Sequence, residues 1–362
     1  MEAVDKKKIS HLHGMLSRAR IITTISHVHP DGDAIGSSLA MLEFLRVTGK
    51  DAASVFPDPA PDSLSFLAGE MPRTDILSYS GEPRETVARL QASDLIICLD
   101  FNDFTRVEGL RDILLATQAP KVLIDHHKDP DLTAFDLAFS RVDVSSTCEL
   151  LYHILLEMPE IQGDPSRLPK AAAHALMTGM TTDTNNFANS TYPSTFAMAA
   201  GLLRAGVNRD DILVHVLQDY PLRRLRILGK LLDSGLHLTP EGVAWMVLDL
   251  ETSASYGLTE GDTEGFVNVP LSVRDIRMSI FLKQESDTCL RVSIRSKRGF
   301  SALALARKCF HGGGHLLAAG GKLWIGQDVA SLAEVPDFLE RNIADFFSSK
   351  NGVIEAQVQV NE

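Results

Sequence analysis

The stretch IITTISHVHPDGD, residues 21–33, decides the fold of this chain. Its first part, IITTIS, is a β-branched run that predicts a strand over residues 21–26. A polar segment follows, and from Ala34 to Leu45 small and apolar residues recur at helical spacing. The order strand, polar loop, helix is typical of an α/β sheet, in which such loops lie at the carboxyl ends of the strands.

The same pattern recurs twice further along the chain. The run LIICL at Leu95–Leu99 ends at Asp100, and Val122–Ile124 ends at Asp125-His126-His127. Apolar runs without alternation belong to strands that are covered on both faces, as in parallel sheets. The predicted fold class is therefore α/β, with a parallel sheet flanked by helices.

The middle of the chain is predicted to be helical. One helix is expected over Ser146–Glu157, where Ser146 and Glu149 form a capping-box pattern, and another over Pro169–Met180. Helical periodicity then runs from Thr195 to about Leu238 with one break at Tyr220-Pro221.

The C-terminal part predicts a smaller α/β domain with a mixed sheet. A strand is expected over Val243–Leu250, and a hairpin is expected from Arg277–Lys283 and Cys289–Arg295 around a polar turn at residues 284–287. A helix over Ser301–Cys309 leads into HGGGH. We predict a catalytic domain at residues 1–205, a helical linker at 206–238 and a substrate-binding domain at 239–350.

Composition excludes several classes of protein. A length of 362 residues predicts two domains, at about 100–200 residues each. The formal net charge of −12 disfavours a protein that coats long nucleic acid. Apolar stretches fall short of the ~18 residues that span a bilayer, and Met1–Ser10 lacks a signal-peptide core, so we expect a cytoplasmic protein without a membrane partner. The four cysteines show no C-x-x-C spacing and are expected to be reduced.

The first polar loop carries His27, His29, Asp31 and Asp33 within seven residues. His27, Asp31 and Asp33 offer one imidazole and two carboxylates, a set of ligands that suits Mn²⁺, Mg²⁺ or Co²⁺. An ordinary polar turn is the alternative, because Pro-Asp-Gly is common turn chemistry. His29 has the weaker case of the two histidines.

The other polar loops strengthen the metal hypothesis. Asp100 and the segment 125–127 follow neighbouring predicted strands, and Asp183 follows a helix of small residues. Four aspartates in one place repel one another unless about two divalent cations neutralise them. The alternative is that each residue only caps its own element. Two such cations favour hydrolysis of phosphoesters or phosphoanhydrides, and the sequence has no Walker-A, G-x-G-x-x-G or G-x-S-x-G motif.

A local basic region lies in the C-terminal half. Between Arg274 and Phe310 there are nine Lys or Arg residues against three Asp or Glu, a local charge of +6. The run Gly312–Gly314 can bring bare backbone N–H groups to a phosphate, although glycine runs are often simple turns. Together with Arg295-Ser296-Lys297 and His315, it predicts a small anion site.

These motifs resemble the DHH phosphoesterase superfamily. Asp125-His126-His127 is the motif that names the family, and residues 27–33, Asp100 and Asp183 stand where its other metal-binding motifs lie. Residues 295–321 resemble the DHH-associated C-terminal domain with its Gly-Gly-Gly-His signature. In its length and the absence of extra domains the chain is similar to the nanoRNase branch, whose members degrade oligoribonucleotides and dephosphorylate 3′-phosphoadenosine 5′-phosphate (pAp).

The resemblance implies a role for each matching residue. Two divalent cations, Mn²⁺ in the first place, would be bound at two adjacent sites. His27 and Asp31 would bind one, and Asp33, His126 and Asp183 the other, with Asp100 as the bridge. His127 would face the scissile phosphate, Asp125 would hold the histidines, and the substrate would be bound by Arg295, Ser296, Gly312, Gly313, Gly314, His315 and Asn268.

The implied substrates are short RNA oligonucleotides, cleaved to nucleoside 5′-monophosphates, and pAp. Long duplex nucleic acid is not expected as a partner, and homodimerisation stays open. A cyclic di-AMP or linear pApA phosphodiesterase is an alternative, because it can share every motif named above. A non-catalytic nucleotide-binding module is a second alternative, but it would normally have lost a metal ligand.

Overall fold

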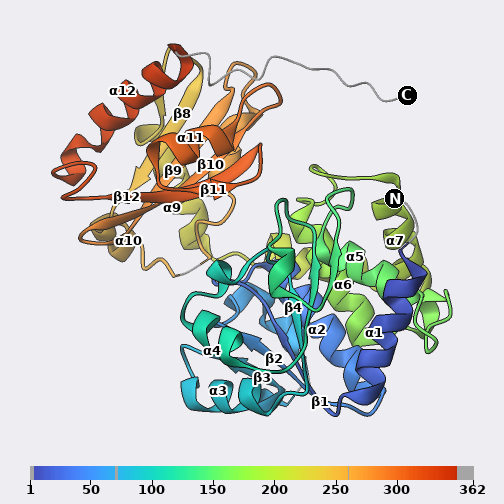
Figure 1. The fold of residues 1–362 in the computed structure, drawn as a ribbon. Helices are drawn as coiled ribbons and strands as arrows, with labels where there is room; N and C mark the ends of the chain where they lie inside the picture. Colours follow the sequence, from blue (N-terminus) through green and yellow to red (C-terminus); the bar gives the residue numbers. More distant parts are fainter. Residues whose placement is uncertain (1–3, 70–71, 260, 349–362) are drawn as a thin grey trace. The chain divides into compact units, whose positions relative to one another are not determined.

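The computed structural model describes residues 4–69, 72–259 and 261–348. It divides into two compact units, Met1–Asp219 and Tyr220–Glu362, which are considered separately (Figure 1). The boundary between the units falls inside the segment 206–238. The outermost ends of the two predicted domains, residues 1–3 and 349–350, lie outside the described residues.

The first unit is built on a six-stranded sheet in the order β3-β2-β1-β4-β5-β6. Every neighbouring pair is parallel, which confirms the predicted fold class. The strands that lead into the three polar loops, β1, β4 and β5, are adjacent. The strands are β1 (Ile21–Ile25), β2 (Asp51–Phe56), β3 (Ile76–Ser78), β4 (Leu95–Leu99), β5 (Lys121–Asp125) and β6 (Leu137–Ser140).

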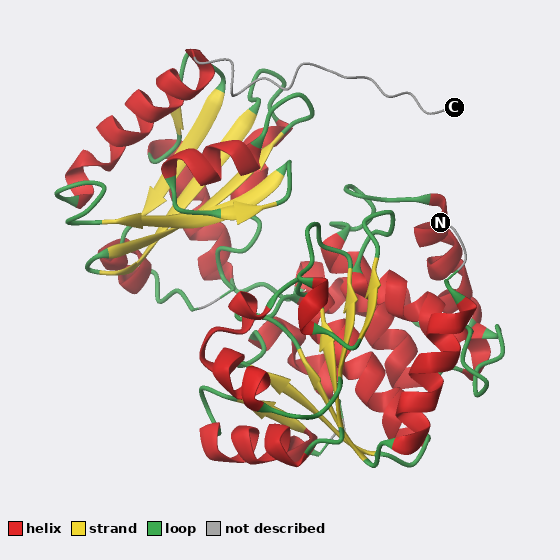
Figure 2. Ribbon diagram, in the orientation of Figure 1, coloured by secondary structure: helices red, strands yellow, loops and turns green. Residues whose placement is uncertain are grey.

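Helices cover both faces of this sheet (Figure 2). In β4, Leu95, Ile97 and Leu99 belong to one apolar core, while Ile96 and Cys98 belong to the core of the opposite face. This is why the strand is apolar throughout. One face packs against α1 (Lys6–Arg18), α2 (Gly32–Val47), α5 (Thr147–Leu156), α6 (Lys170–Asp183) and α7 (Pro193–Arg204), and the other against α3 (Pro83–Ala92) and α4 (Arg111–Ala116).

Close backbone packing joins α2, α5 and α6. A Cβ added at Gly179 would lie 2.3 Å from Cys148 Sγ and 2.9 Å from the carbonyl oxygen of Gly32, and one added at Gly36 would lie 2.6 Å from the carbonyl oxygen of Ala175. Glycine is needed here because no side chain fits between the helices. The contact brings the start of α2 next to the end of α6.

The second unit contains a mixed six-stranded sheet in the order β11-β12-β10-β9-β8-β7. β8 and β9 are parallel, and the other neighbours are antiparallel. The strands are β7 (His237–Leu238), β8 (Val243–Leu248), β9 (Met278–Ser286), β10 (Cys289–Ser296), β11 (Gly313–Gly314) and β12 (Ala318–Trp324). The helices of this unit are α9 (Leu222–Ser234), α10 (Leu250–Ser255), α11 (Ala302–Cys309) and α12 (Val335–Ser348).

Several sequence-based boundaries were wrong. The predicted turn at 284–287 is mostly strand, because the hairpin pairs Gln284 with Leu290 and turns only after Ser286. The segment from Thr195 to Leu238 breaks more than once, since α7 ends before Gly206, which has a φ of 91°. α8 (Arg209–Leu213) and a π-helical turn (Val214–Gln218) follow in the first unit before α9 begins in the second.

The described residues contain no helix that is both long and apolar enough to cross a membrane. All four cysteines are buried and unpaired, as expected from their spacing.

Candidate metal centre

Asp100 stands at the centre of the site, directly after β4. The residue is 2% exposed, and its backbone N–H donates to the carbonyl oxygen of Ile124 on β5 (3.1 Å). The residue has a φ of 66°, in the left-handed region that non-glycine residues rarely adopt. This strained turn directs the carboxylate along the carboxyl edge of the sheet.

The two carboxylate oxygens of Asp100 face different histidines. Oδ2 lies 3.4 Å from Nε2 of His27, which follows β1. Oδ1 lies 3.6 Å from Nε2 of His126 and 3.8 Å from Nδ1 of His127, both of which follow β5. One carboxylate is therefore shared between two neighbouring groups of donors.

Asp31 and Asp33 belong to the start of α2. Oδ1 of Asp31 accepts from the backbone N–H groups of Asp33 (3.0 Å) and Ala34 (3.1 Å) and so caps the helix. Asp33 is 1% exposed, and its carboxylate accepts from the N–H groups of Thr147 (2.7 Å) and Cys148 (2.9 Å) at the start of α5. The glycine between the two aspartates allows this close approach to α6, because a Cβ there would meet the side chain of Thr182.

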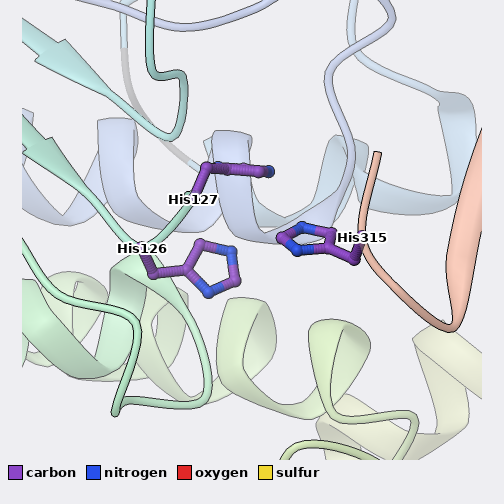
Figure 3. A group of neighbouring side chains, drawn as sticks. All are labelled: His126, His127 and His315. Carbon is purple, nitrogen blue, oxygen red and sulfur yellow. The ribbon is translucent and has the colours of Figure 1, made fainter. Parts of the chain in front are cut away.

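His126 gathers three aspartates around one nitrogen. Its Nε2 lies 3.6 Å from Asp100, 3.7 Å from Asp183 and 3.9 Å from Asp33. Asp183 is the last residue of α6, so the packing of that helix against α2 sets its position. His126 and His127 follow β5 as neighbours (Figure 3). Their ring centroids are 4.7 Å apart.

Asp125 fixes the second histidine of the motif. One carboxylate oxygen lies 2.7 Å from Nδ1 of His127, and the other accepts its backbone N–H at 3.1 Å. Asp125 is fully buried. The resemblance implies that Asp125 holds both histidines. The contacts described here join it to His127, whereas Nε2 of His126 faces the other aspartates.

The electrostatics of the site favour a bound cation. Burial, and then the charges of Asp33 and Asp31, raise the pKa of Asp100 well above its usual value. Burial lowers the pKa of His27, although Asp31 opposes the shift. No Lys or Arg nitrogen among the described residues lies within ion-pair distance of Asp33 or Asp100. Clustered carboxylates and imidazoles suit divalent ions.

His29 lies outside this cluster. It has a φ of 50°, its backbone N–H donates to Asp58 (2.8 Å), and its ring Nδ1 lies 3.5 Å from the same carboxylate. Its side chain is 55% exposed. The structure thus separates the two histidines of the first loop.

Sequence reasoning missed two contributors to the site. The backbone N–H groups of Thr147 and Cys148 hold Asp33, a contact that the N-cap pattern before α5 does not reveal because the pattern names the helix start and not its partner. The backbone N–H of Val28 donates to the carbonyl oxygen of Arg106 (2.9 Å), and the positive charge of the Arg106 side chain helps to lower the pKa of His27. The predicted capping box is only partly confirmed. The hydroxyl of Ser146 caps α5, but the carboxylate of Glu149 accepts the backbone N–H of Ser145 and not that of Ser146.

Two family models match the chain. Residues 21–180 match the N-terminal domain of the DHH family, and residues 243–345 match the DHHA1 domain. A bifunctional oligoribonuclease and PAP phosphatase, NrnA from Thermus thermophilus, is 32% identical over 302 residues, which cover 82% of each chain. The chain belongs to the DHH family. It is a metal-dependent phosphoesterase of that family.

Two further relatives extend the comparison. The cyclic-di-AMP phosphodiesterase PdeA from Listeria monocytogenes is 24% identical over 86% of this chain and 46% of its own length. The crystal structure of an exopolyphosphatase-related protein from Bacteroides fragilis superposes with a TM-score of 0.88 at 31% identity, covering 97% of this chain and 99% of that one. Nearly the whole chain therefore shares its fold with that solved structure.

In the DHHA1 domain, Arg295, Gly313, Gly314 and His315 lie close to Ala318 and Ala319 at the start of β12. Arg295 on β10 pairs with Ala318 on β12, and the backbone N–H of His315 donates to the same Ala318 (2.7 Å). Asn268 is exposed on the 3₁₀ segment Phe266–Ser272, which lies beside β9 and β10. The hydroxyl of Ser296, in contrast, donates to the carbonyl of Phe300 (2.8 Å).

The glycine run of the DHHA1 domain also has a structural purpose. The N–H of Gly312 donates to Ala306, and a Cβ at this position would lie 1.9 Å from the carbonyl oxygen of Gly320. Gly313 and Gly314 form the short strand β11, which pairs with β12. Close contact between two backbones thus requires glycine at 312 and 314, whereas a Cβ at Gly313 would meet nothing within 4 Å.

Proposed function

We propose that this chain is a dinuclear-metal phosphoesterase that hydrolyses short oligoribonucleotides to nucleoside 5′-monophosphates and pAp to AMP. The observation that carries the proposal is the position of Asp100, whose two oxygens face two separate groups of donors. A bridging carboxylate between two cations has this arrangement. Mn²⁺ is the preferred ion because the donors are carboxylates and imidazoles without thiolates, with Mg²⁺ and Co²⁺ as alternatives.

The donors divide into two sets that share Asp100. Ligand atoms of His27, Asp31 and Asp100 lie within 4.8 Å of one another, and so do those of Asp33, Asp100 and His126. Asp183, which lies 3.7 Å from Nε2 of His126, completes the second set. These distances support one cation in each set. Bound there, the cations would supply an activated water and neutralise the phosphoryl oxygens.

His127 is proposed to act on the substrate rather than on a cation. A carboxylate can only accept a hydrogen bond, so Asp125 selects the tautomer that carries a proton on Nδ1 of His127. The other ring nitrogen, Nε2, would contact the scissile phosphate, to which it can donate when it also carries a proton. Asp125 thus orients His127, as carboxylates commonly orient histidines at metal sites.

The preference for short substrates rests on charge and on the relatives. The net charge of −12 repels extended polyanions, whereas the local charge of +6 between Arg274 and Phe310 can hold one terminal phosphate. Similarity to NrnA over 82% of both chains supports oligoribonucleotides and pAp as substrates. Similarity to PdeA favours cyclic di-AMP or linear pApA as the second candidate.

One substrate panel distinguishes these activities. Purified protein with Mn²⁺ is incubated with pAp, a 5′-phosphorylated diribonucleotide, cyclic di-AMP and pyrophosphate, and products are separated by chromatography. We expect AMP from pAp and mononucleotides from the dinucleotide. Faster turnover of cyclic di-AMP would establish the second candidate, and the absence of hydrolysis of all four would contradict the proposal.

A further inference from the structure

We propose that Thr147 is a positioning residue for one of the two cations, the one held by Asp33, Asp100 and His126. This inference rests on the dinuclear centre proposed above. Thr147 is fully buried at the first position of α5. It comes from the helix between the DHH motif and Asp183, and it contributes no ligand atom of its own.

Thr147 makes hydrogen bonds to two of the proposed ligands at once. Its backbone N–H donates to Oδ2 of Asp33 at 2.7 Å, and its hydroxyl donates to Oδ1 of Asp100 at 2.9 Å. The next N–H along, that of Cys148, donates to Oδ1 of Asp33 at 2.9 Å. Two carboxylates, one from the start of α2 and one from the loop after β4, are therefore fixed relative to one another by a single residue.

The contacts of Thr147 fall on one side of the site. The hydroxyl bonds the oxygen of Asp100 that faces His126, whereas the other oxygen of Asp100 faces His27. Asp33 also lies on the His126 side, 3.9 Å from its Nε2. Loss of the hydroxyl should therefore disturb the His126 set and leave the His27 set largely intact.

A buried network holds Thr147 in place. The hydroxyl of Ser146 caps α5 by accepting the N–H of Glu149 (3.0 Å). The fully buried carboxylate of Glu149 accepts the N–H of Ser145 (2.9 Å) and the hydroxyl of Thr195 at the start of α7 (2.6 Å). The segment before α5 is thereby anchored to a second helix, so the threonine presents its two donors in a fixed direction.

The test replaces the hydroxyl without changing the shape of the side chain. Thr147→Val removes the donor, Thr147→Ser keeps it, and Thr178→Val is the matched control, because Thr178 is an equally buried threonine whose hydroxyl bonds the carbonyl of its own helix. Mn²⁺ binding to the metal-free proteins is measured by calorimetry, and Mn–Mn coupling by electron paramagnetic resonance. Melting curves are recorded in parallel.

We expect wild type, Thr147→Ser and Thr178→Val to bind two Mn²⁺ with coupled spins. In Thr147→Val one site should weaken by about 10–100-fold, the usual effect of losing a group that orients a ligand, and the coupling should disappear at limiting Mn²⁺. If Thr147→Val fails to fold, Thr147→Ala against Thr147→Ser provides the same comparison.

The outcomes separate this inference from the proposed function. Wild-type protein that binds fewer than two Mn²⁺ would overturn the dinuclear centre itself. Wild-type protein that binds two, with both retained at unchanged affinity in Thr147→Val, would overturn only the role of Thr147. Equal weakening of both sites, or a Thr147→Ser variant as weak as Thr147→Val, would also overturn it.

Discussion

At the scale of single residues, the proposed chemistry depends on Asp100, a carboxylate that the metal-free protein does not favour as an ion. Asp100 is buried and faces other aspartates, so ionisation is costly until opposite charge arrives. Its left-handed backbone adds a second constraint, because aspartate and asparagine tolerate that conformation better than most residues. Asparagine therefore removes the charge of Asp100 while retaining the turn and an acceptor for Thr147.

The first prediction concerns Asp100→Asn. We expect kcat to fall by orders of magnitude and Mn²⁺ stoichiometry to fall below two, because the shared ligand loses its charge. Steady-state kinetics and metal analysis of the dialysed protein measure both effects. Asp112→Asn, at an exposed carboxylate on α4, serves as the control and should behave like wild type. Near wild-type turnover in Asp100→Asn would refute the bridging role.

The second prediction concerns the pH dependence of stability in the metal-free protein. The folded-state pKa of Asp100 is raised above the ordinary value of 3.8, so the folded chain holds this proton more tightly than the unfolded chain. Ionisation of Asp100 therefore destabilises the folded chain. The free energy of unfolding falls as pH rises from about 3.8 to the raised pKa, and above that pKa Asp100 causes no further decrease.

Asp100→Asn lacks this titration and should melt at a higher temperature than metal-free wild type at neutral pH. The difference in Tm should shrink towards zero as pH falls to about 4, close to the ordinary pKa of 3.8. Calorimetry in the presence of a chelator measures it. Saturating Mn²⁺ should reverse the order, and a Tm difference independent of pH would contradict the prediction.

At the scale of elements, the contact between α2, α5 and α6 places the ligands. Asp33 lies in the first turn of α2, Asp183 ends α6, and glycines allow these two helices to approach each other and Cys148 of α5 closely. We therefore expect helix packing and metal binding to be coupled, because a small displacement between α2 and α6 would move proposed ligands of the same cation.

The third prediction is that Gly179→Ala destabilises the protein and weakens metal binding together. The new Cβ would meet Cys148 Sγ at 2.3 Å, an overpacking that typically costs about 1–3 kcal/mol. Thermal melting and Mn²⁺ calorimetry measure the two effects. In Gly14→Ala, on α1, the new methyl group would meet only the end of the Arg18 side chain at 3.4 Å, and metal binding should be unchanged. Unaltered Mn²⁺ affinity in Gly179→Ala would show that packing and binding are independent.

The sequence predicts the parts of this fold that have strong local signals. β1, β4 and β5 are apolar or β-branched runs that end in charged loops, and the sheet class follows from them. β3 and β6 span only three and four residues, too few to show a period. The contact of Asp33 with α5 joins residues 114 positions apart, and no local pattern encodes such a pair.

At the scale of the whole molecule, the charge distribution leads us to expect a preference for short substrates. The chain carries −12 overall but +6 between Arg274 and Phe310. A long polyanion meets the overall repulsion, whereas a short one can present its terminal phosphate to the basic region. Part of that region stabilises the fold, since Lys297 donates to the carbonyl of Val273 and Arg291 pairs with Glu285.

The fourth prediction is therefore a dependence on substrate length. Oligoribonucleotides of two to about five residues should be cleaved with higher kcat/KM than a thirty-residue strand at moderate salt. Added salt screens the repulsion, so it should reduce the difference in kcat/KM between the short and the long substrates. Labelled RNAs resolved on gels measure the rates. Equal rates on both lengths at low salt would exclude charge as the basis of selection.

The fifth prediction separates substrate binding from chemistry through Arg295. If the DHHA1 domain holds the remote phosphate, Arg295→Ala should raise KM strongly and lower kcat less, with unchanged Mn²⁺ content. Arg295→Lys should recover only part of the loss, because an ammonium cannot replace a bidentate guanidinium. Arg291→Ala, on the same strand and paired with Glu285, is the control.

The decisive comparison for Arg295 uses two substrates. A 5′-phosphorylated dinucleotide has a second phosphate that Arg295 could bind, whereas a nitrophenyl phosphodiester has only the scissile one. The effect of Arg295→Ala should therefore be confined to the dinucleotide. Because β10 also forms the centre of the DHHA1 sheet, melting curves must show that the variant is folded. An equal loss on both substrates would assign Arg295 to the stability of its domain, and the remote phosphate would have to be bound by other residues.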